Sequence, residues 1–227
     1  SRNQVEVLGG GYYEPVFPLL FPIDRSGQIE KLNARLRETV GKRPRGMALA
    51  GNVWDYSLVT SLNSCGMDYL ELDATLVPSA SRYFYPLITG GLGKSIKILC
   101  VHSELLPNLQ GGEMPESWIL RIQKAALRSV RGDESPVIML SFDPPRFKQF
   151  FASDCFSYVA GYFENPKGEA YRGVRFTLPQ AYLKGAKVFI PSYIPAGMDW
   201  MYFTITNLIA FLLGVIGSVL STAQTLF

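Results

Sequence analysis

Four carboxylates near the ends of strand-like runs are the residues of this sequence best placed for chemistry. Glu6 lies within one such run, Glu14 follows it, and Asp73 and Asp143 close two others. In a fold that alternates strands and helices, the carboxyl ends of parallel strands meet at one face, so these side chains would converge there. Glycoside cleavage needs two carboxylates across one bond. The sequence therefore suggests a glycoside-cleaving acid cluster, and solvation or capping by the same acids is the simpler alternative.

A second candidate is the turn within residues 47–56, "MALAGNVWDY". A small apolar run reaches Gly51, and a new helical segment is expected to start a few residues later. This order of strand, sharp turn and helix start is typical of an active-site elbow at the carboxyl end of a barrel or sheet strand. Such an elbow usually presents a charged or nucleophilic side chain, and Gly51 presents none. Whether the elbow performs chemistry is the question that the rest of the sequence must answer.

Strand-like and helix-like runs alternate along the chain, which predicts an α/β fold with a mainly parallel sheet. We expect strands at 5–8, 47–50, 68–73, 94–101, 135–143 and 186–191, and helices at 28–40, 57–64 and 115–130. The helix at 28–40 is amphipathic, with Ile29, Leu32 and Leu36 on one face. These elements would have to position the acids and the elbow.

Several other kinds of site are disfavoured. The run 88–95, "ITGGLGKS", lacks the first glycine of a phosphate loop and leads into a strand, so we interpret it as a hairpin turn. His102 is the only histidine, which argues against a histidine-based triad or zinc site. A net charge of +3 without a basic arm argues against nucleic-acid binding, and three widely spaced cysteines favour reduced thiols. We expect no cofactor and no metal.

Residues 200–227 carry no charge and are long enough to cross a bilayer, which needs about 20 residues. Trp200 lies where an interfacial aromatic belt would be, and Gly214 and Ser218 have the small-xxx-small spacing of closely packed membrane helices. We therefore predict a body at 1–199 and a C-terminal transmembrane helix at 200–227. The lysines before this helix favour a cytoplasmic body. The alternative is a cytoplasmic protein in which this helix is buried in the core.

Five blocks of the chain, at 4–33, 43–73, 93–109, 135–148 and 181–200, carry recognisable motifs in a fixed order. The first contains "GGGYYEPVF", and the second contains "GMALAGNVWDYSL", which is similar to "GxWLAERVWEPxL". Together they resemble glycoside hydrolase family 57, whose members include 4-α-glucanotransferases and α-amylases acting on α-1,4-glucans. The resemblance implies a partial (β/α)₇-type barrel followed by the hydrophobic helix. The family's N-terminal "HQP" strand has no counterpart, so we expect a barrel truncated at its N-terminus.

The resemblance also assigns roles to positions. Family 57 enzymes use a retaining mechanism, with a glutamate nucleophile and an aspartate acid/base. The nucleophile position falls on Gly51, and the acid/base position falls on Asp143, whose flanking motif has changed. Asp73 matches the first aspartate of the family's "DD" pair, and Glu14 keeps its motif position. Glycine cannot attack a sugar, and loss of a covalent nucleophile costs about 10⁴- to 10⁶-fold in rate.

The leading hypothesis is therefore a degenerate, inactive relative of an α-1,4-glucan-acting enzyme. It would hold an α-glucan or maltooligosaccharide weakly through the substrate-binding candidates Tyr12, Tyr13, Glu14, Trp54 and Asp73. Aromatic platforms suit the faces of sugars, and simple packing is the alternative role for these rings.

Two rival hypotheses stay open. One is a residually active α-glucan hydrolase or transferase that uses Asp143 together with Asp55 or a bound water. The other is a membrane-anchored interaction protein, or a gene remnant, without a sugar function. If Asp55 replaces the lost nucleophile, its displaced position is a handicap, because a displacement of about 1 Å already costs about 10²-fold in rate.

Overall fold

The computed structural model describes residues 5–78, 84–91, 93–130, 134–165, 167–168 and 173–197. Its described strands form one sheet in the order β1-β2-β4-β3-β5. They are β1 (Gly46–Ala48), β2 (Tyr69–Asp73), β3 (Leu87–Gly91), β4 (Lys94–Val101) and β5 (Ile190–Pro191). β1, β2 and β4 are parallel, β3 is antiparallel to β4, and β5 is parallel to β3. The predicted α/β class with a mainly parallel sheet is confirmed.

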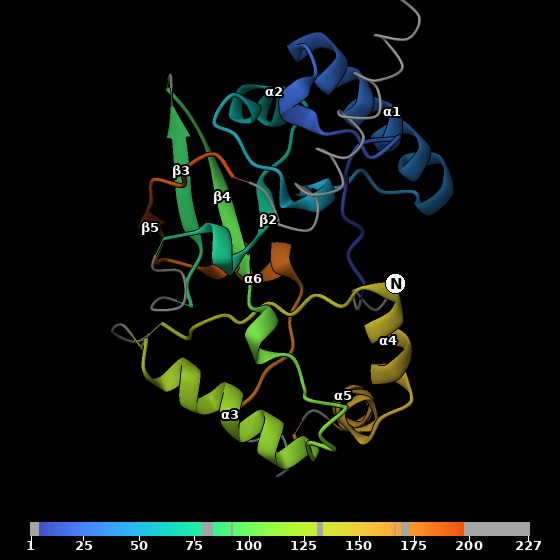
Figure 1. Cartoon of the computed structure of the whole chain (residues 1–227), viewed down its shortest axis with the longest axis vertical. Coiled ribbons are helices and arrows are strands. Elements are labelled where there is room, and N and C mark those ends of the chain that lie inside the picture. Colours follow the sequence, from blue (N-terminus) through green and yellow to red (C-terminus); the bar gives the residue numbers. More distant parts are fainter. Residues whose placement is uncertain are drawn as a thin grey trace, which may run out of the picture.

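The helices divide into groups around this sheet. They are α1 (Pro22–Val40), α2 (Leu58–Ser64), α3 (Pro115–Leu127), α4 (Pro144–Phe151), α5 (Asp154–Glu164) and α6 (Pro179–Gly185). Figure 1 shows α1 and α2 beside the sheet at the upper end, α3, α4 and α5 grouped at the lower end, and α6 between them. α1, α3, α4 and α6 each begin with proline, whose missing N–H costs nothing at that position.

The two faces of the sheet pack against different partners. Leu70 and Leu72 of β2 share a buried apolar cluster with Ile29 of α1 and Leu58 of α2. Tyr69 belongs to a separate cluster with residues of β4 and α6. Because successive strand residues point to opposite faces, the side chains of residues 69, 71 and 73 share this second face. The candidate carboxylates of β2 therefore lie on the side of the sheet away from α1 and α2.

Most of the predicted elements are present. β1, β2 and β4 and helices α2 and α3 match the expected runs within a few residues, and α1 extends the amphipathic helix toward its N-terminus as far as Pro22. In the run 88–95, residues 88–91 of β3 and 94–95 of β4 belong to antiparallel neighbours, as expected of a hairpin. Gly66 follows α2 with φ of 71°, a left-handed conformation suited to the residue after a helix.

Two of the predicted strands are wrong, and a third is shorter than predicted. Residues 5–8 form no ladder, and only Gly9 pairs with Met47. The run 135–143 meets β4 in a single bridge between Val101 and Met139. Pro136 donates no N–H, and Val137 donates its N–H to the Phe84 carbonyl rather than to a strand partner. The strand expected at 186–191 is reduced to the two residues of β5.

Helices α4, α5 and α6 were not predicted. The expected C-terminal helix at 200–227 lies outside the described residues, so the structure gives it no support. Among the helices that the structure does describe, none is both long enough and apolar enough to span a membrane.

Candidate functional site

The elbow after β1 has the sharp geometry expected of it, and it lacks a reactive side chain. Gly51 lies at φ 60°, ψ 18°, and Asn52 follows at φ 52°. Two successive left-handed residues are uncommon, and asparagine tolerates this region better than most residues do. The Asn52 side-chain oxygen accepts a hydrogen bond from the backbone N–H of Asp73 at 3.2 Å. The elbow is thereby fixed to the end of β2.

Asp73 is held by local hydrogen bonds at the carboxyl end of β2. Its Oδ1 accepts bonds from the Thr75 backbone N–H at 2.8 Å and from the Thr75 hydroxyl at 2.7 Å, and its Oδ2 accepts one from the Ser103 hydroxyl at 2.9 Å. Burial alone would raise the pKa of Asp73, but these bonds together with nearby His102 hold it below its ordinary value. The group is an ionised carboxylate with both oxygens occupied.

Asp143 caps a helix. Its Oδ1 accepts a hydrogen bond from the backbone N–H of Arg146 at 2.7 Å, and its Oδ2 lies 3.6 Å from the guanidinium of the same residue. Asp73 pairs with Val101, which in turn bridges to Met139, so the stretch leading to Asp143 runs past the same edge of the sheet. Within the described chain, no hydrogen bond joins Asp143 to Asp73 or to the elbow.

The loop that carries Tyr12, Tyr13 and Glu14 is exposed, and a lysine covers its rings. The two tyrosine rings meet edge to face at 4.8 Å, and Lys31 Nζ lies 4.3 Å from the Tyr12 centroid and 4.7 Å from that of Tyr13. Lys31 also donates a hydrogen bond to the Tyr13 hydroxyl at 3.1 Å. Glu14 has φ of 47°. A sugar that stacks on these rings would compete with the Lys31 ammonium.

Trp54 lies in the core. Its side chain is 1% exposed, and its Nε1 donates a hydrogen bond to the Ile194 carbonyl at 3.1 Å. Its backbone exchanges two hydrogen bonds with Gly197, at 2.8 and 3.0 Å. The indole has no exposed face for a sugar, so its geometry is that of the packing alternative.

The four acids do not form one cluster. Glu6 lies at the opposite end of β2 from Asp73, because its two oxygens accept bonds from the Tyr69 hydroxyl at 2.8 Å and from the backbone N–H of Gln180 at 2.9 Å. These contacts fix the N-terminal segment to β2 and α6, which is a structural role.

Glu71 is the unusual acid that sequence reasoning missed. It is 7% exposed, and its Oε1 has no hydrogen-bond partner among the described residues. Burial, and secondarily the charge of Glu6, raise the pKa of Glu71 to about 7. The signal was present in "YLELD": strand alternation places a glutamate on the same face as Tyr69.

The remaining polar candidates have structural roles. His102 is buried, with Nδ1 3.0 Å from Glu104 Oε1 and its ring edge against Phe84. The three cysteines are buried free thiols, as expected. Within the described residues, no group of three or more histidine, cysteine or acidic side chains is arranged to hold a metal ion.

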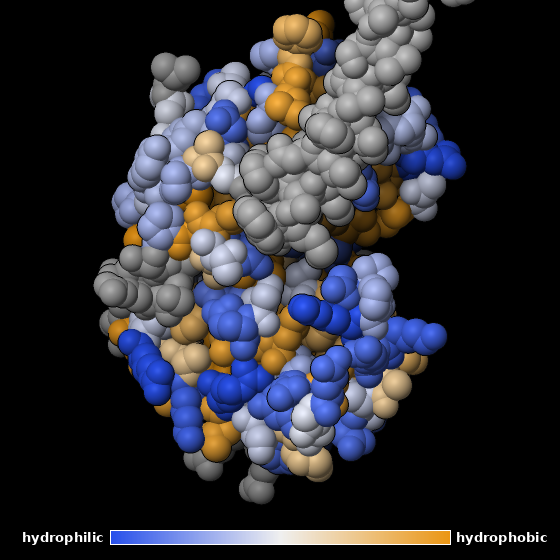
Figure 2. Space-filling view, viewed as in Figure 1, coloured by the Kyte–Doolittle hydropathy of each residue, from blue (hydrophilic) through white to orange (hydrophobic). Residues whose placement is uncertain are grey.

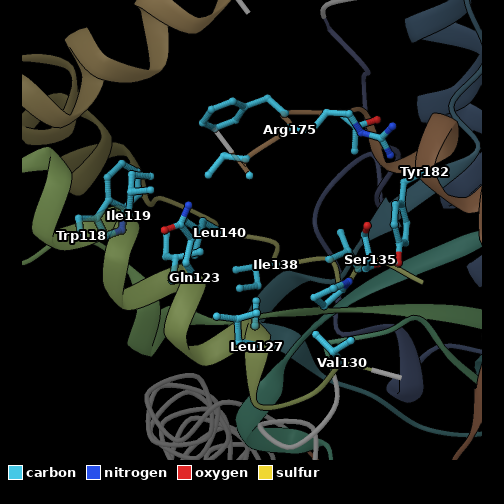
Figure 3. Close-up of a pocket in the computed structure, with 18 residues that line it drawn as sticks. Trp118, Ile119, Gln123, Leu127, Val130, Ser135, Ile138, Leu140, Arg175 and Tyr182 are labelled. Atoms are coloured by element: carbon cyan, nitrogen blue, oxygen red, sulfur yellow. Dashed lines mark hydrogen bonds between the residues drawn. The ribbon is translucent and has the colours of Figure 1, made fainter. Parts of the chain in front are cut away.

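Two apolar regions lie apart from these residues. A cavity of about 800 Å³ is lined mainly by α3 and by the extended segments 135–140 and 173–177, with Arg175 and Tyr182 among its few polar groups. Figure 3 shows Trp118, Ile119 and Leu127 along the helical side of this cavity. Figure 2 shows hydrophobic surface at the upper end of the molecule, where α1 and α2 lie. None of the predicted site residues lines the cavity.

The chain is similar in sequence to known proteins of one family. The model of glycosyl hydrolase family 57 matches residues 1–163. A 4-alpha-glucanotransferase of Thermococcus kodakarensis is 35% identical over 109 residues, which is 46% of this chain and 16% of that protein. Alpha-amylase 1 of Dictyoglomus thermophilum is 39% identical over 73 residues, 32% of this chain and 11% of that protein. The chain therefore spans only a small part of the relatives that it matches.

Solved structures show the same fold. The 4-alpha-glucanotransferase of Thermococcus litoralis superposes with a TM-score of 0.69 at 22% identity, over 86% of this chain and 31% of that chain. The alpha-amylase AmyC of Thermotoga maritima has a TM-score of 0.65 at 13% identity, over 92% of this chain and 55% of that chain. The family model covers well over half of the present sequence. The chain belongs to glycosyl hydrolase family 57.

Proposed function

We propose that this protein is a degenerate relative of α-1,4-glucan-acting family 57 enzymes, without retaining glycosidase or glucanotransferase activity. One observation carries the proposal: Gly51, which the family resemblance assigns to the nucleophile position, lies at the tip of an otherwise well-formed elbow. Retaining chemistry needs one carboxylate to attack and one to protonate. Gly51 and Asn52 offer no carboxylate at this turn. The names of the relatives, which are glucanotransferases and amylases, support the α-glucan class.

The nearby acids are poor substitutes for the missing nucleophile. Asp55 accepts a hydrogen bond from the Ser57 backbone N–H at 2.8 Å, and hydrogen bonding to Ser57 lowers its pKa. Asp73 has both oxygens engaged by Thr75 and Ser103. Both carboxylates are oriented by these local donors, and neither stands at the tip of the elbow. Asp143, at the acid/base position, would then have no counterpart across the bond.

We infer that weak glucan binding survives the loss of catalysis. Tyr12, Tyr13 and Glu14 keep the family's motif in an exposed loop beside the start of α1. Each contact between a ring and a sugar face is expected to contribute about 1 kcal/mol. A few such contacts give dissociation constants near the millimolar range, about −4 kcal/mol in total.

Two architectural inferences accompany this function. We propose that the described sheet and helices form part of a (β/α)₇-type barrel within a body at residues 1–199. We also propose, from sequence alone, that the charge-free segment 200–227 is a separate membrane-associating part. Extraction with alkaline carbonate tests the second inference: the full chain should stay with the membranes, whereas a chain lacking residues 200–227 should not.

The proposal is tested by trapping. An activated 5-fluoro-α-glycosyl fluoride leaves a covalent glycosyl adduct on the nucleophile of a retaining enzyme. We expect the intact mass of this protein to be unchanged after incubation, while an active family 57 glucanotransferase in a parallel reaction gains one glycosyl unit. An adduct on Asp55 or Asp73 would show that another carboxylate attacks, and it would contradict the proposal that the protein lacks retaining activity.

A further inference from the structure

A stack of aromatic rings ends in an exposed tyrosine after β5. Tyr193 is 72% exposed, and its ring stacks on Tyr56 with a centroid distance of 5.5 Å and an interplanar angle of 22°. Tyr56 in turn lies 6.0 Å from Trp54. One face of the Tyr193 ring is therefore covered by Tyr56, while most of the side chain is open to solvent.

The lower part of the stack is held rigidly. The Thr89 hydroxyl donates a hydrogen bond to the Tyr56 hydroxyl at 2.9 Å, and Thr89 itself is buried. Trp54 is fixed by its bond to the Ile194 carbonyl and by its backbone pairing with Gly197. A ring that is already immobilised loses little conformational entropy when a ligand stacks on it. The stack thus supports Tyr193 as a preorganised platform.

A shallow depression of about 430 Å³ lies beside the platform. Gly90 and Gly91 are among its lining residues, so part of its wall is bare backbone. Gly90 cannot carry a side chain here, because an added Cβ would collide with the Lys94 carbonyl. Lys94, Ser95 and Ser192 supply hydrogen-bonding groups around the same depression.

We propose that this platform is a second glucan-binding site, in which an α-linked glucose oligosaccharide stacks on Tyr193 and hydrogen-bonds to the hairpin. The choice of a glucan rests on the proposed function. The geometry suits a sugar because one open aromatic face accepts the apolar face of a pyranose, while hydroxyl and backbone groups at its side accept the ring hydroxyls. A flat nucleobase gains most from a slot between two rings, and Tyr56 already occupies one face of Tyr193.

The proposed site lies apart from Asp73 along the sheet. Gly90 pairs with Ser95 near the start of β4, whereas Asp73 pairs with Val101 at its end. A glucan bound at Tyr193 would therefore lie toward the opposite end of β4 from Asp73, on a platform whose Tyr56 follows the elbow by four residues. Its binding needs neither a nucleophile nor an acid.

The test is a titration of the full chain with maltoheptaose, in which binding is measured by calorimetry and by amide NMR. We expect the wild type to bind and the Gly90 and Gly91 amide signals to shift. Tyr193→Ala should weaken the binding that the Gly90 and Gly91 shifts report about five- to tenfold, as loss of one ring contact predicts. Tyr193→Phe, which keeps the ring, should bind within about twofold of the wild type. The matched control is Tyr13→Ala, which removes an equally exposed tyrosine from the other loop and should leave the Gly90 and Gly91 shifts intact.

Two results would overturn the inference in distinguishable ways. Wild-type binding that survives Tyr193→Ala but is lost in Tyr13→Ala would place the glucan on the Tyr12–Glu14 loop and leave the proposed function standing. Absence of any shift on addition of maltoheptaose to the folded wild type would remove glucan binding altogether, while the proposed loss of catalysis, tested by trapping, would be unaffected. The wild-type amide shifts decide the location even if the Tyr193→Ala variant does not fold.

Discussion

The Tyr69 hydroxyl donates a hydrogen bond to Glu6 at 2.8 Å, and the same face of β2 carries Glu71. Glu6 also accepts a hydrogen bond from the Gln180 backbone N–H, whereas Oε1 of Glu71 is buried without a partner in the described chain. A carboxyl group in such a poorly solvated place does not ionise cheaply, and the charge of Glu6 adds to the cost. The arrangement therefore makes the stability of the fold depend on pH.

Stability should fall as pH rises from about 4.5 to 7. The pKa of Glu71 is raised to about 7 in the folded state, from an ordinary value of 4.5. Between these values the unfolded chain has lost the proton that the folded chain retains, so rising pH favours unfolding. The full cost, present above pH 7, is about 3 kcal/mol. Urea denaturation at pH 5 and pH 8 gives the difference in the free energy of unfolding that tests this prediction.

Glu71→Gln supplies the control for this prediction. The amide cannot ionise, so the variant should lose the decline between pH 5 and 8 and should be more stable than the wild type at pH 8. Glu38→Gln, at an exposed position of α1, should keep the wild-type decline. Equal pH profiles for the wild type and Glu71→Gln would show that Glu71 ionises normally. Asp55, Asp73 and Glu113 have lowered pKa values, so their stabilisation is lost in a separate, more acidic range.

Two glycines, Gly46 of β1 and Gly27 of α1, should respond in opposite directions to substitution by alanine. A Cβ on Gly46 would collide with the ring of Tyr69, which also anchors Glu6. Gly46→Ala should therefore destabilise the protein by about 1–3 kcal/mol. Gly27 lies inside α1 with open space around it, and Gly27→Ala should stabilise by about 0.5–1 kcal/mol. Thermal unfolding of both variants gives the comparison, and a neutral Gly46→Ala would mean that Tyr69 moves without cost.

Gly51→Ala should cost about 1–2 kcal/mol, because φ of 60° is unfavourable for a residue with a side chain. Gly51→Glu should carry a similar cost, because the backbone at this position suits glycine. Gly185→Ala, at the end of α6 with open space around it, is the control and should be near neutral. Chemical denaturation gives the free energy of unfolding of the three variants. If the substitutions at Gly51 lowered it as little as Gly185→Ala does, the expected backbone strain at Gly51 would be contradicted.

Trp54→Ala should destabilise the protein by about 3–5 kcal/mol, as removal of a buried tryptophan does. It would also leave the Ile194 carbonyl without its indole donor. Tyr13→Ala, at a side chain that is 70% exposed, should change stability by less than about 0.5 kcal/mol. Denaturation curves separate the two cases, and a mild effect of Trp54→Ala would mean that the indole is not part of the core.

Sequence reasoning succeeded where a local pattern is sufficient. The face formed by Ile29, Leu32 and Leu36 identified α1, and the run before Val101 identified β4. It failed where partners far along the chain decide. Residues 135–143 have the composition of a strand, but they find only one bridging contact with β4. Local periodicity does not reveal how many ladder hydrogen bonds a neighbouring chain will supply.

The candidate site shows the same division. Gly51, Asp73 and Asp143 lie after β1, on β2 and beyond the Val101–Met139 bridge, and the roles that the motifs suggest for them stay predictions. The burial of Trp54 depends on residues 194–197, far away in sequence, and could not be read from its own neighbourhood. The influence of Glu6 on the pKa of Glu71 comes from a segment far away in sequence and was missed for the same reason.

Product analysis after prolonged incubation with maltoheptaose tests the central claim most directly. Because a lost nucleophile costs about 10⁴- to 10⁶-fold in rate, we predict no shorter or longer maltooligosaccharides above the background of buffer alone. Asp143→Ala should give the same result as the wild type. Products that form with the wild type and disappear in Asp143→Ala would show that the retained acid works with another nucleophile, and would contradict the account.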